Sequence, residues 1–320
     1  MISQISAEIK QVLSSFPSED QIIFNNKQIK VDKSNFLEIA NNYSNQTIAF
    51  IDGGQAEILS AGNFCLSFIR VFAQIFKENK KLESEKREFY LFTKAKWINY
   101  NGKEDLFYES KIFTVWGNRL IHENDLLLSS TDQTIKSGIE RASISKISNI
   151  ARRFAELSLA AELQHKVDFV VLDGTLEKTF TNEEKYLSKL NEKVSALAKT
   201  SSLFTVQGNS PVILLNKLSS GGCWKYLIDG TSYFVKLNEH SKYVFRFEGN
   251  PEVLPNLIQN STDALFLGYP YGLILTDKMA RVSNEEKNSL KMNFLLKAEN
   301  RAIAEYLSSS NAHDILDSLG

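Results

Sequence analysis

The sequence predicts a mixed α/β fold, and three observations carry this prediction. Two segments far apart in the chain, residues 47–54 and 167–176, read as apolar strands that run into an Asp-Gly turn. An amphipathic helix is expected before the second of them, where apolar residues recur mainly at three- and four-residue steps. The composition, 43% hydrophobic and 23% charged over 320 residues, is that of a globular protein with a sizeable core.

The segment 167–176 reads Val-Asp-Phe-Val-Val-Leu-Asp-Gly-Thr-Leu, and five of its first six residues are apolar. It therefore predicts a buried strand that ends at Asp173. Burying a carboxylate without a partner costs several kcal/mol, so we expect Asp173 to meet a cation, a metal ion or water. Gly174 lets the backbone turn sharply beside it. Taken alone, such a pattern is more often a plain strand followed by an Asp-Gly turn.

The pattern occurs a second time, at residues 47–54, which read Thr-Ile-Ala-Phe-Ile-Asp-Gly-Gly. We expect this strand to end at Asp52 and to lie next to the strand that ends at Asp173. Two such strands can place both carboxylates at one edge of a sheet, which is a common way to build a divalent metal site.

The cysteines and histidines do not form a site of their own. Cys65 and Cys223 lie far apart in the sequence, lack the paired spacing of a zinc site, and are expected to be buried free thiols. The four histidines fall in no ligand-like cluster. A metal would therefore be held by carboxylates, which suit hard ions such as Mg²⁺ or Mn²⁺.

The charge balance gives no general sign of a nucleic-acid partner. Lys plus Arg is 37 and Asp plus Glu is 38, for a formal net charge of −1. A local basic groove can still bind phosphates on such a surface. Candidates for guiding a DNA strand, each of which can equally be a solvated surface charge, are Lys94, Lys96, Arg152, Arg153 and Arg281.

No membrane span and no export signal are expected. The longest apolar runs, such as residues 263–275, contain Gly and Pro and fall short of the roughly 20 residues that cross a bilayer. The N-terminus lacks a basic segment followed by an apolar run. We therefore expect a cytoplasmic protein that does not contact a membrane.

The remaining elements follow in order. Residues 1–20 carry Ile5, Ile9, Val12 and Leu13 at helical spacing, and a second short helix is expected near 35–41. Strands are expected at 56–60, 65–76, 89–95 and 106–115, with the charge run 78–88 as a loop or helix end. A helix over 184–196, strands within 204–218 and 224–247, and a helix over 285–307 with a frayed tail complete the prediction.

The predicted helix between residues 139 and 159 contains Glu156 among apolar residues. It could pair with Arg152 one turn earlier, a contact that contributes a few tenths of a kcal/mol. Alternatively, it could turn towards the end of the sheet as a third acidic ligand. Periodicity alone favours the Arg152–Glu156 pair.

Five motifs in this order resemble the NurA-domain nucleases, which process DNA ends and have an RNase H-like core. They are Asp52 in Phe-Ile-Asp-Gly-Gly, Glu156 after Arg152-Arg153, Asp173 in Val-Leu-Asp-Gly-Thr-Leu, Lys199 in Leu-Ala-Lys-Thr-Ser, and Gly268-Tyr269-Pro270. The resemblance spans roughly residues 45–281. It implies an RNase H-like mixed sheet flanked by helices, with an N-terminal helical extension (1–44), a nuclease core (45–281) and a C-terminal helix and tail (282–320).

The resemblance also implies roles for individual residues. Asp52, Glu156 and Asp173 would hold Mn²⁺ or Mg²⁺, Lys199 would contact the substrate or organise the site, and Tyr269 would stand beside the reacting strand. The family pattern has a histidine after the Tyr-Pro turn, where this chain has Asp277. A carboxylate cannot act as a neutral imidazole does at pH 7, so a slow and strongly metal-dependent enzyme is expected.

Three functions are open at this point. The first, which the resemblance implies, is a metal-dependent DNA nuclease that acts on single-stranded and duplex ends in double-strand-break repair, as a homodimer docked on a HerA-type hexameric ATPase. The second is a catalytically weakened relative that binds DNA or docks on the translocase, because Asp277 replaces the histidine. The third is another RNase H-like nuclease, such as a transposase or an Argonaute-like protein.

Overall fold

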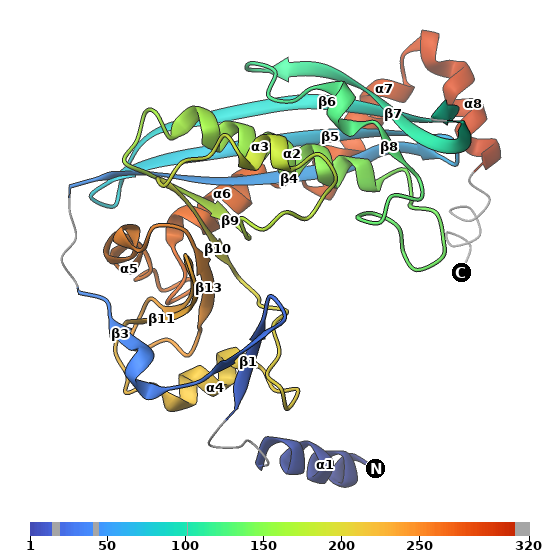
Figure 1. Ribbon diagram of the computed structural model, residues 1–320. Coiled ribbons are helices and arrows are strands. Elements are labelled where there is room, and N and C mark those ends of the chain that lie inside the picture. The colour runs from blue at the N-terminus through green and yellow to red at the C-terminus, as the bar shows by residue number, and fades with distance from the viewer. Residues whose placement is uncertain (15–19, 41–44, 101, 311–320) are drawn as a thin grey trace. The chain divides into compact units, whose positions relative to one another are not determined.

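A computed structural model of the protein (Figure 1) describes residues 1–14, 20–40, 45–100 and 102–310. The chain divides into two compact units. The first unit holds residues 1–46, 173–176 and 195–271, and the second holds residues 47–172, 177–194 and 272–320. The predicted mixed α/β fold, with a large mixed sheet flanked by helices, is confirmed.

Among the residues that the structure describes, eleven strands form one sheet in the order β3-β11-β12-β13-β10-β9-β4-β5-β6-β7-β8, and two further strands form a separate hairpin. β4 pairs with β9 in parallel, whereas β4 pairs with β5, β5 with β6 and β6 with β7 in antiparallel fashion. The strands are β1 (Gln21–Phe24), β2 (Lys27–Lys30), β3 (Phe36–Glu38), β4 (Thr47–Ala61), β5 (Phe64–Lys77), β6 (Lys80–Tyr100), β7 (Lys103–Trp116), β8 (Leu128–Ser129), β9 (Phe169–Asp173), β10 (Val194–Ala198), β11 (Trp224–Asp229), β12 (Ser232–Lys236) and β13 (Phe245–Glu248).

The second unit is built on the long meander β4 to β7. The turn between β5 and β6 contains two residues, Glu78 and Asn79, which lie between the paired residues Lys77 and Lys80. Both adopt positive φ values, +50° and +58°. Apolar side chains along β4 and β5 are almost fully buried, among them Phe50, Ile51 and Ile69. The meander is therefore the rigid base that carries Asp52.

Helix α2 (Lys146–Leu163) packs against β4 and β5. Its buried residues include Ile147, Ile150, Phe154 and Leu157, at the spacing of one helix face. Phe154 stacks on Tyr186 of the short helix α3 (Glu184–Leu187), with ring centroids 4.5 Å apart. The helix predicted before the central strand is thus present, although it begins at Lys146.

The last helices of the second unit follow the sheet. α6 (Tyr271–Ala280), α7 (Asn284–Leu295) and α8 (Arg301–Ser310) are joined by short segments, with the 3₁₀ turn η4 (Ala298–Asn300) before α8. Phe294 of α7 and Leu307 of α8 pack on a cluster that includes Ile58 and Phe68 of the sheet. The single helix predicted over 285–307 is therefore two helices, and residues 311–320 of the predicted frayed tail lie outside the described residues.

The first unit has a second core. Its cluster contains Ile22, Trp224, Tyr226 and Phe234, which come from β1, β11 and β12. α4 (Pro211–Leu218) and α5 (Leu254–Asn260) complete the unit, together with the 3₁₀ turns η1 (Lys33–Asn35) and η3 (Pro251–Val253). The second unit contains one more 3₁₀ turn, η2 (Glu123–Leu126).

Several local predictions are wrong for physical reasons. The charge run 78–88 lies largely in β6, because residues 80–83 are exposed and the charges at Glu85, Arg87 and Glu88 are paired with opposite charges. The helix predicted over 184–196 ends at Leu187, and Val194–Ala198 is the buried strand β10. Residues 211–218 form α4 instead of a strand. A short apolar run fits a buried strand and a buried helix equally well, so periodicity could not decide.

The N-terminal segment is less helical than the sequence suggested. α1 (Ile2–Ser14) is present as predicted, but residues 21–38 form β1, β2 and β3 with the turn η1 instead of a second helix. β3 pairs with β11, so this segment joins the first unit instead of forming a detached extension. Within the described residues, no helix is both long and apolar enough to cross a membrane.

Candidate functional site

Asp173, Lys199 and Tyr269 meet in the first unit. Asp173 is the last residue of β9, and Lys199 directly follows β10. The Lys199 Nζ atom lies 2.5 Å from Oδ2 of Asp173, and the Tyr269 hydroxyl donates a hydrogen bond to Oδ1 at 3.2 Å. The predicted cation beside Asp173 is therefore Lys199, and three of the predicted site residues form one group.

Tyr269 is held rigidly in this group. Its side chain is 2% exposed and packs on Phe245, with ring centroids 5.1 Å apart. The Lys199 ammonium lies over the Tyr269 ring, 5.6 Å from its centroid. Lys199 itself is 46% exposed. A buried phenol thus orients the carboxylate, and a half-exposed ammonium remains accessible to an anionic substrate.

The turn after Asp173 is fixed by two residues that the sequence analysis missed. Glu248 accepts a hydrogen bond from the Leu176 N–H at 2.7 Å, and its other oxygen lies 2.8 Å from Arg246 Nη2. Both charged side chains are about 5% exposed. Gly174, whose φ is +113°, donates its N–H to the Leu197 carbonyl. The sequence signal for this pair is that β13 reads Phe-Arg-Phe-Glu, in which the two charged residues alternate with buried aromatic ones.

The sequence predicted that the strand would end at Asp52. Instead, Asp52 lies inside β4, which continues to Ala61. The strand continues through Gly53 and Gly54 because both glycines allow close packing. A Cβ at Gly53 would lie 2.4 Å from Glu156 Oε1, and a Cβ at Gly54 would lie 2.1 Å from the Ala280 carbonyl oxygen. Asp52 is 8% exposed, and its Oδ1 accepts a hydrogen bond from the Gly53 N–H.

Glu156 forms the i, i+4 pair that periodicity favoured. Its Oε1 accepts a hydrogen bond from Nη1 of Arg152 at 2.5 Å, and Arg152 also donates to Gln55 and to the Gly53 carbonyl. The Gly53 position of β4 therefore faces Glu156, since a Cβ there would meet the Glu156 carboxylate.

The strand that carries Asp52 and the strand that precedes Asp173 are neighbours. β4 and β9 pair in parallel, with Ile48 opposite Phe169 and Ile51 opposite Leu172. The predicted adjacency of the two strands is confirmed.

The predicted set of three metal ligands can be tested on this arrangement. Carboxylates suit Mg²⁺ or Mn²⁺ in their chemistry. Among the residues that the structure describes, however, no group of three or more His, Cys, Asp or Glu side chains is placed to hold an ion. Asp52, Glu156 and Asp173 all carry such an oxygen ligand, and the Glu156 carboxylate is paired with Arg152.

Asp277 lies on α6 and pairs with Arg281 one turn later, at 2.8 Å. This is the contact expected for a partly solvated helix face. Most of the other cations proposed for guiding DNA also meet carboxylates: Lys94 pairs with Glu109, Arg152 with Glu156 and Arg153 with Glu183. Lys96 is exposed.

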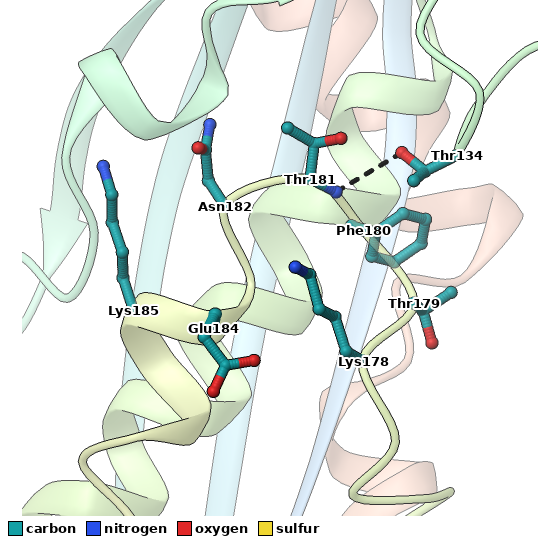
Figure 2. Close-up of a pocket in the computed structure, with 8 residues that line it drawn as sticks. All are labelled: Thr134, Lys178, Thr179, Phe180, Thr181, Asn182, Glu184 and Lys185. Carbon is teal, nitrogen blue, oxygen red and sulfur yellow. Dashed lines mark hydrogen bonds between the residues drawn. The ribbon is translucent and has the colours of Figure 1, made fainter.

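The two cysteines are free thiols, of which Cys65 is buried and Cys223 half-buried. The loop at residues 178–185 lines a pocket of about 520 Å³ in the second unit. Figure 2 shows Thr134 beside this loop, where it accepts a hydrogen bond from the Thr181 N–H. Of the two lysines of the pocket, Lys185 is held by Asp125 at 2.6 Å. No predicted site residue is among the residues that line the pocket.

Comparison with solved structures identifies the fold. The chain aligns with the NurA nuclease from Sulfolobus solfataricus over 94% of its own length and 95% of that chain, with a TM-score of 0.51 and 12% sequence identity. The chain has a NurA-like fold. No model of a known protein family matches the sequence, and no curated protein matches it.

Other solved structures align less closely with this NurA-like chain. Endonuclease V from Ciona intestinalis, in complex with a DNA containing an inosine, aligns with 77% of this chain and 87% of its own, at a TM-score of 0.41 and 10% identity. The catalytic domain of human endonuclease V aligns with 77% of this chain and 84% of its own, at a TM-score of 0.38 and 12% identity.

Proposed function

We propose that this protein is a DNA nuclease that hydrolyses phosphodiester bonds at Asp173. The observation that carries the proposal is the convergence of Lys199 and Tyr269 on the Asp173 carboxylate at the end of a buried strand. A carboxylate held by a buried phenol and a half-exposed ammonium is fixed in position before substrate binds, as a catalytic group must be. The NurA-like fold supports the same reaction class.

We further propose that Asp52, Glu156 and Asp173 bind Mn²⁺ or Mg²⁺, supported by the preference of these hard ions for carboxylate oxygens. When bound, such an ion would activate a water molecule and stabilise the leaving oxygen. Asp173 and Glu156 would then exchange or share their present partners, Lys199 and Arg152, with the ion.

The chain's own residues have distinct roles in this proposal. The ammonium of Lys199 is half-exposed, so it can bind a phosphate oxygen of the incoming strand. The Tyr269 hydroxyl donates a hydrogen bond to Oδ1 of Asp173, and the Lys199 ammonium pairs with Oδ2. The Arg246–Glu248 pair fixes the turn that follows Asp173, so the carboxylate is held in place before substrate binds.

The test is an assay of the purified protein on end-labelled DNA, with Mn²⁺, with Mg²⁺ and with EDTA. Cleavage that requires a divalent ion supports the proposal. Cleavage that persists in EDTA contradicts the metal part, and binding without cleavage at any metal concentration contradicts the reaction.

A second candidate function is a catalytically weakened DNA-binding or translocase-docking subunit. It is favoured by the ion pairs that hold Glu156 and Asp173 and by Asp277 in place of the family histidine. Asp277→His separates the two. If the helix faces the metal site, the substitution raises the cleavage rate; if Asp277 only pairs with Arg281, the rate and the Mn²⁺ midpoint both stay unchanged.

We also propose that the protein acts in double-strand-break repair as a homodimer on a HerA-type hexameric ATPase. The NurA-like fold supports the dimer and the partner, and α1, whose Ile2, Ile5 and Ile9 are 77%, 52% and 54% exposed, supplies the docking surface. An exposed apolar stripe on a helix suits docking to a partner. Deleting residues 1–17 should weaken co-purification with such an ATPase while the thermal unfolding of the rest of the protein is preserved. Unchanged co-purification would exclude α1 as the docking surface.

A further inference from the structure

An aromatic cluster of the first unit extends from the Asp173 site to the surface. Tyr269 contacts Phe266 edge-on, with ring centroids 5.9 Å apart and planes at 90°. Phe266 in turn stacks on Tyr243, with centroids 4.8 Å apart and planes at 20°. Since the Tyr269 hydroxyl donates to Asp173, the outer rings are linked to that carboxylate through a single side chain.

Exposure rises sharply along this cluster. Tyr269 is 2% exposed, whereas Phe266 is 38% exposed and Tyr243 is 52% exposed. Single exposed aromatic residues are common and need no explanation. Two stacked rings that are both exposed and continue a buried site are a different case, because they present a flat apolar surface to solvent beside Asp173.

The two loops that carry these rings are fastened to each other. Gly268, with φ at +97°, donates its N–H to the Ser261 carbonyl at 2.9 Å. A Cβ at Gly268 would lie 2.5 Å from Ser241 Oγ, so the loop before Tyr269 approaches the loop before Tyr243 closely. The Tyr243 N–H donates to the same Ser241 Oγ at 3.1 Å. The rings are therefore presented in a fixed orientation.

The chemistry of the cluster suits unpaired nucleobases. Every base has a π-face, and a base that is not paired in a duplex is free to stack on an aromatic side chain. Lys242 precedes Tyr243 and is exposed, and the Lys199 ammonium lies over the Tyr269 ring, so cations are available for phosphates at both ends. The same loops also carry two carboxylates, Glu239 and Asp263, which would not attract phosphates. Asp263 accepts a hydrogen bond from the Leu265 N–H.

We propose that Tyr243 and Phe266 form a stacking platform for unpaired bases of a DNA strand, adjacent to Asp173. The inference rests on the proposed nuclease function for its biological meaning, although the binding that it describes does not require cleavage. It assigns the substrate class as a strand with single-stranded nucleotides at the scissile position, such as an overhang or a frayed end.

The experiment measures binding in EDTA, so that cleavage plays no part. Fluorescence anisotropy gives the Kd of the full-length protein for a labelled duplex with a single-stranded overhang and for the same duplex with blunt ends. Loss of one stacked base costs about 5- to 150-fold in affinity, from a stacking contribution of about 1–3 kcal/mol. Tyr243→Ala and Phe266→Ala should each weaken overhang binding within that range, and Tyr243→Trp should retain it.

A matched control is Trp97→Ala, which removes a ring that is 61% exposed on the second unit. It should leave the Kd within about twofold. A second arm replaces one overhang nucleotide at a time by an abasic one. At the stacked position, the abasic substitution and Tyr243→Ala should not add, because each removes the same contact.

The outcomes separate this inference from the proposed function. Weaker overhang binding by both alanine variants, with non-additive abasic effects, supports the platform even if the wild type cleaves no DNA. Unchanged overhang affinity in both variants overturns it even if the wild type is an active nuclease, and leaves the rings as a surface for a protein partner. An equal loss for overhang and blunt DNA also overturns it, because stacking on unpaired bases would then play no part.

Discussion

Arg153 was predicted to guide DNA, but the structure gives it a structural role that can be measured. Glu183 is 0% exposed, and its Oε1 accepts a hydrogen bond from Arg153 Nε at 2.8 Å. Its Oε2 accepts from the N–H groups of Thr179 and Phe180 at 2.6 and 2.8 Å. Glu183 therefore closes the loop after the Asp173 turn, and Arg153 neutralises it.

Arg153→Met removes one partner of this buried pair and leaves an uncompensated carboxylate. We expect the free energy of unfolding to fall by about 3–5 kcal/mol. Adding Glu183→Gln removes the charge and keeps an oxygen that can accept from the two N–H groups. The double variant should therefore be more stable than Arg153→Met alone. Urea unfolding, followed by tryptophan fluorescence, measures both differences.

The control is Arg119→Met, which breaks the exposed pair with Glu123, where the side chains are 42% and 37% exposed. Exposed pairs contribute at most about 1 kcal/mol, so this variant should be nearly as stable as the wild type. The reasoning is refuted if Arg153→Met unfolds at the same urea concentration as Arg119→Met. A loss of DNA affinity with unchanged stability would return Arg153 to the DNA-guiding residues.

Three further predictions concern local packing and protonation. Gly54→Ala should destabilise the protein by about 1–3 kcal/mol in urea unfolding, because its Cβ would meet the Ala280 carbonyl, whereas Gly62→Ala, with open space around it, should not. Hydrogen bonds from Ser129, Arg141 and Thr131 hold the pKa of Asp105 well below its ordinary value of 3.8, so its stabilising effect is present above that value and lost as the pH falls below it. Asp105→Asn should therefore flatten the loss of stability measured between about pH 4 and pH 2. Burial raises the pKa of the Cys65 thiol to about 11, so iodoacetamide should modify Cys65 at pH 8 only after unfolding, as mass spectrometry of the native protein would show.

The sequence predicted the part of the fold that strong local patterns determine. The apolar run before Asp173 and the run before Asp52 are the parallel pair β9 and β4, as expected from their similarity. The helix around Phe154 followed from its periodicity. These signals were sufficient because burial on one face or on both leaves a clear pattern.

The rest depended on contacts between residues far apart in the chain. The sequence Gly53-Gly54 predicted a turn, but both residues lie within β4. They are glycines where Glu156 and Ala280 approach the strand so closely that a Cβ would meet them. The strand β10 resembled a helix end, since a buried apolar pentapeptide has no periodicity to read. The aromatic contact between Tyr269 and Phe266 likewise left no pattern in the sequence.

Cleavage by variants that keep the size of the side chain tests most directly whether Asp173 and Asp52 are essential carboxylates of a nuclease. Wild type, Asp173→Asn, Asp52→Asn and the control Asp229→Asn would be compared on end-labelled DNA with Mn²⁺ at equal folded concentration. Asp229 lies at the β11–β12 turn and pairs at 3.5 Å with exposed Lys27. We predict that both site variants lose cleavage while the control keeps it. Near-wild-type cleavage by Asp173→Asn or by Asp52→Asn would contradict the proposed site.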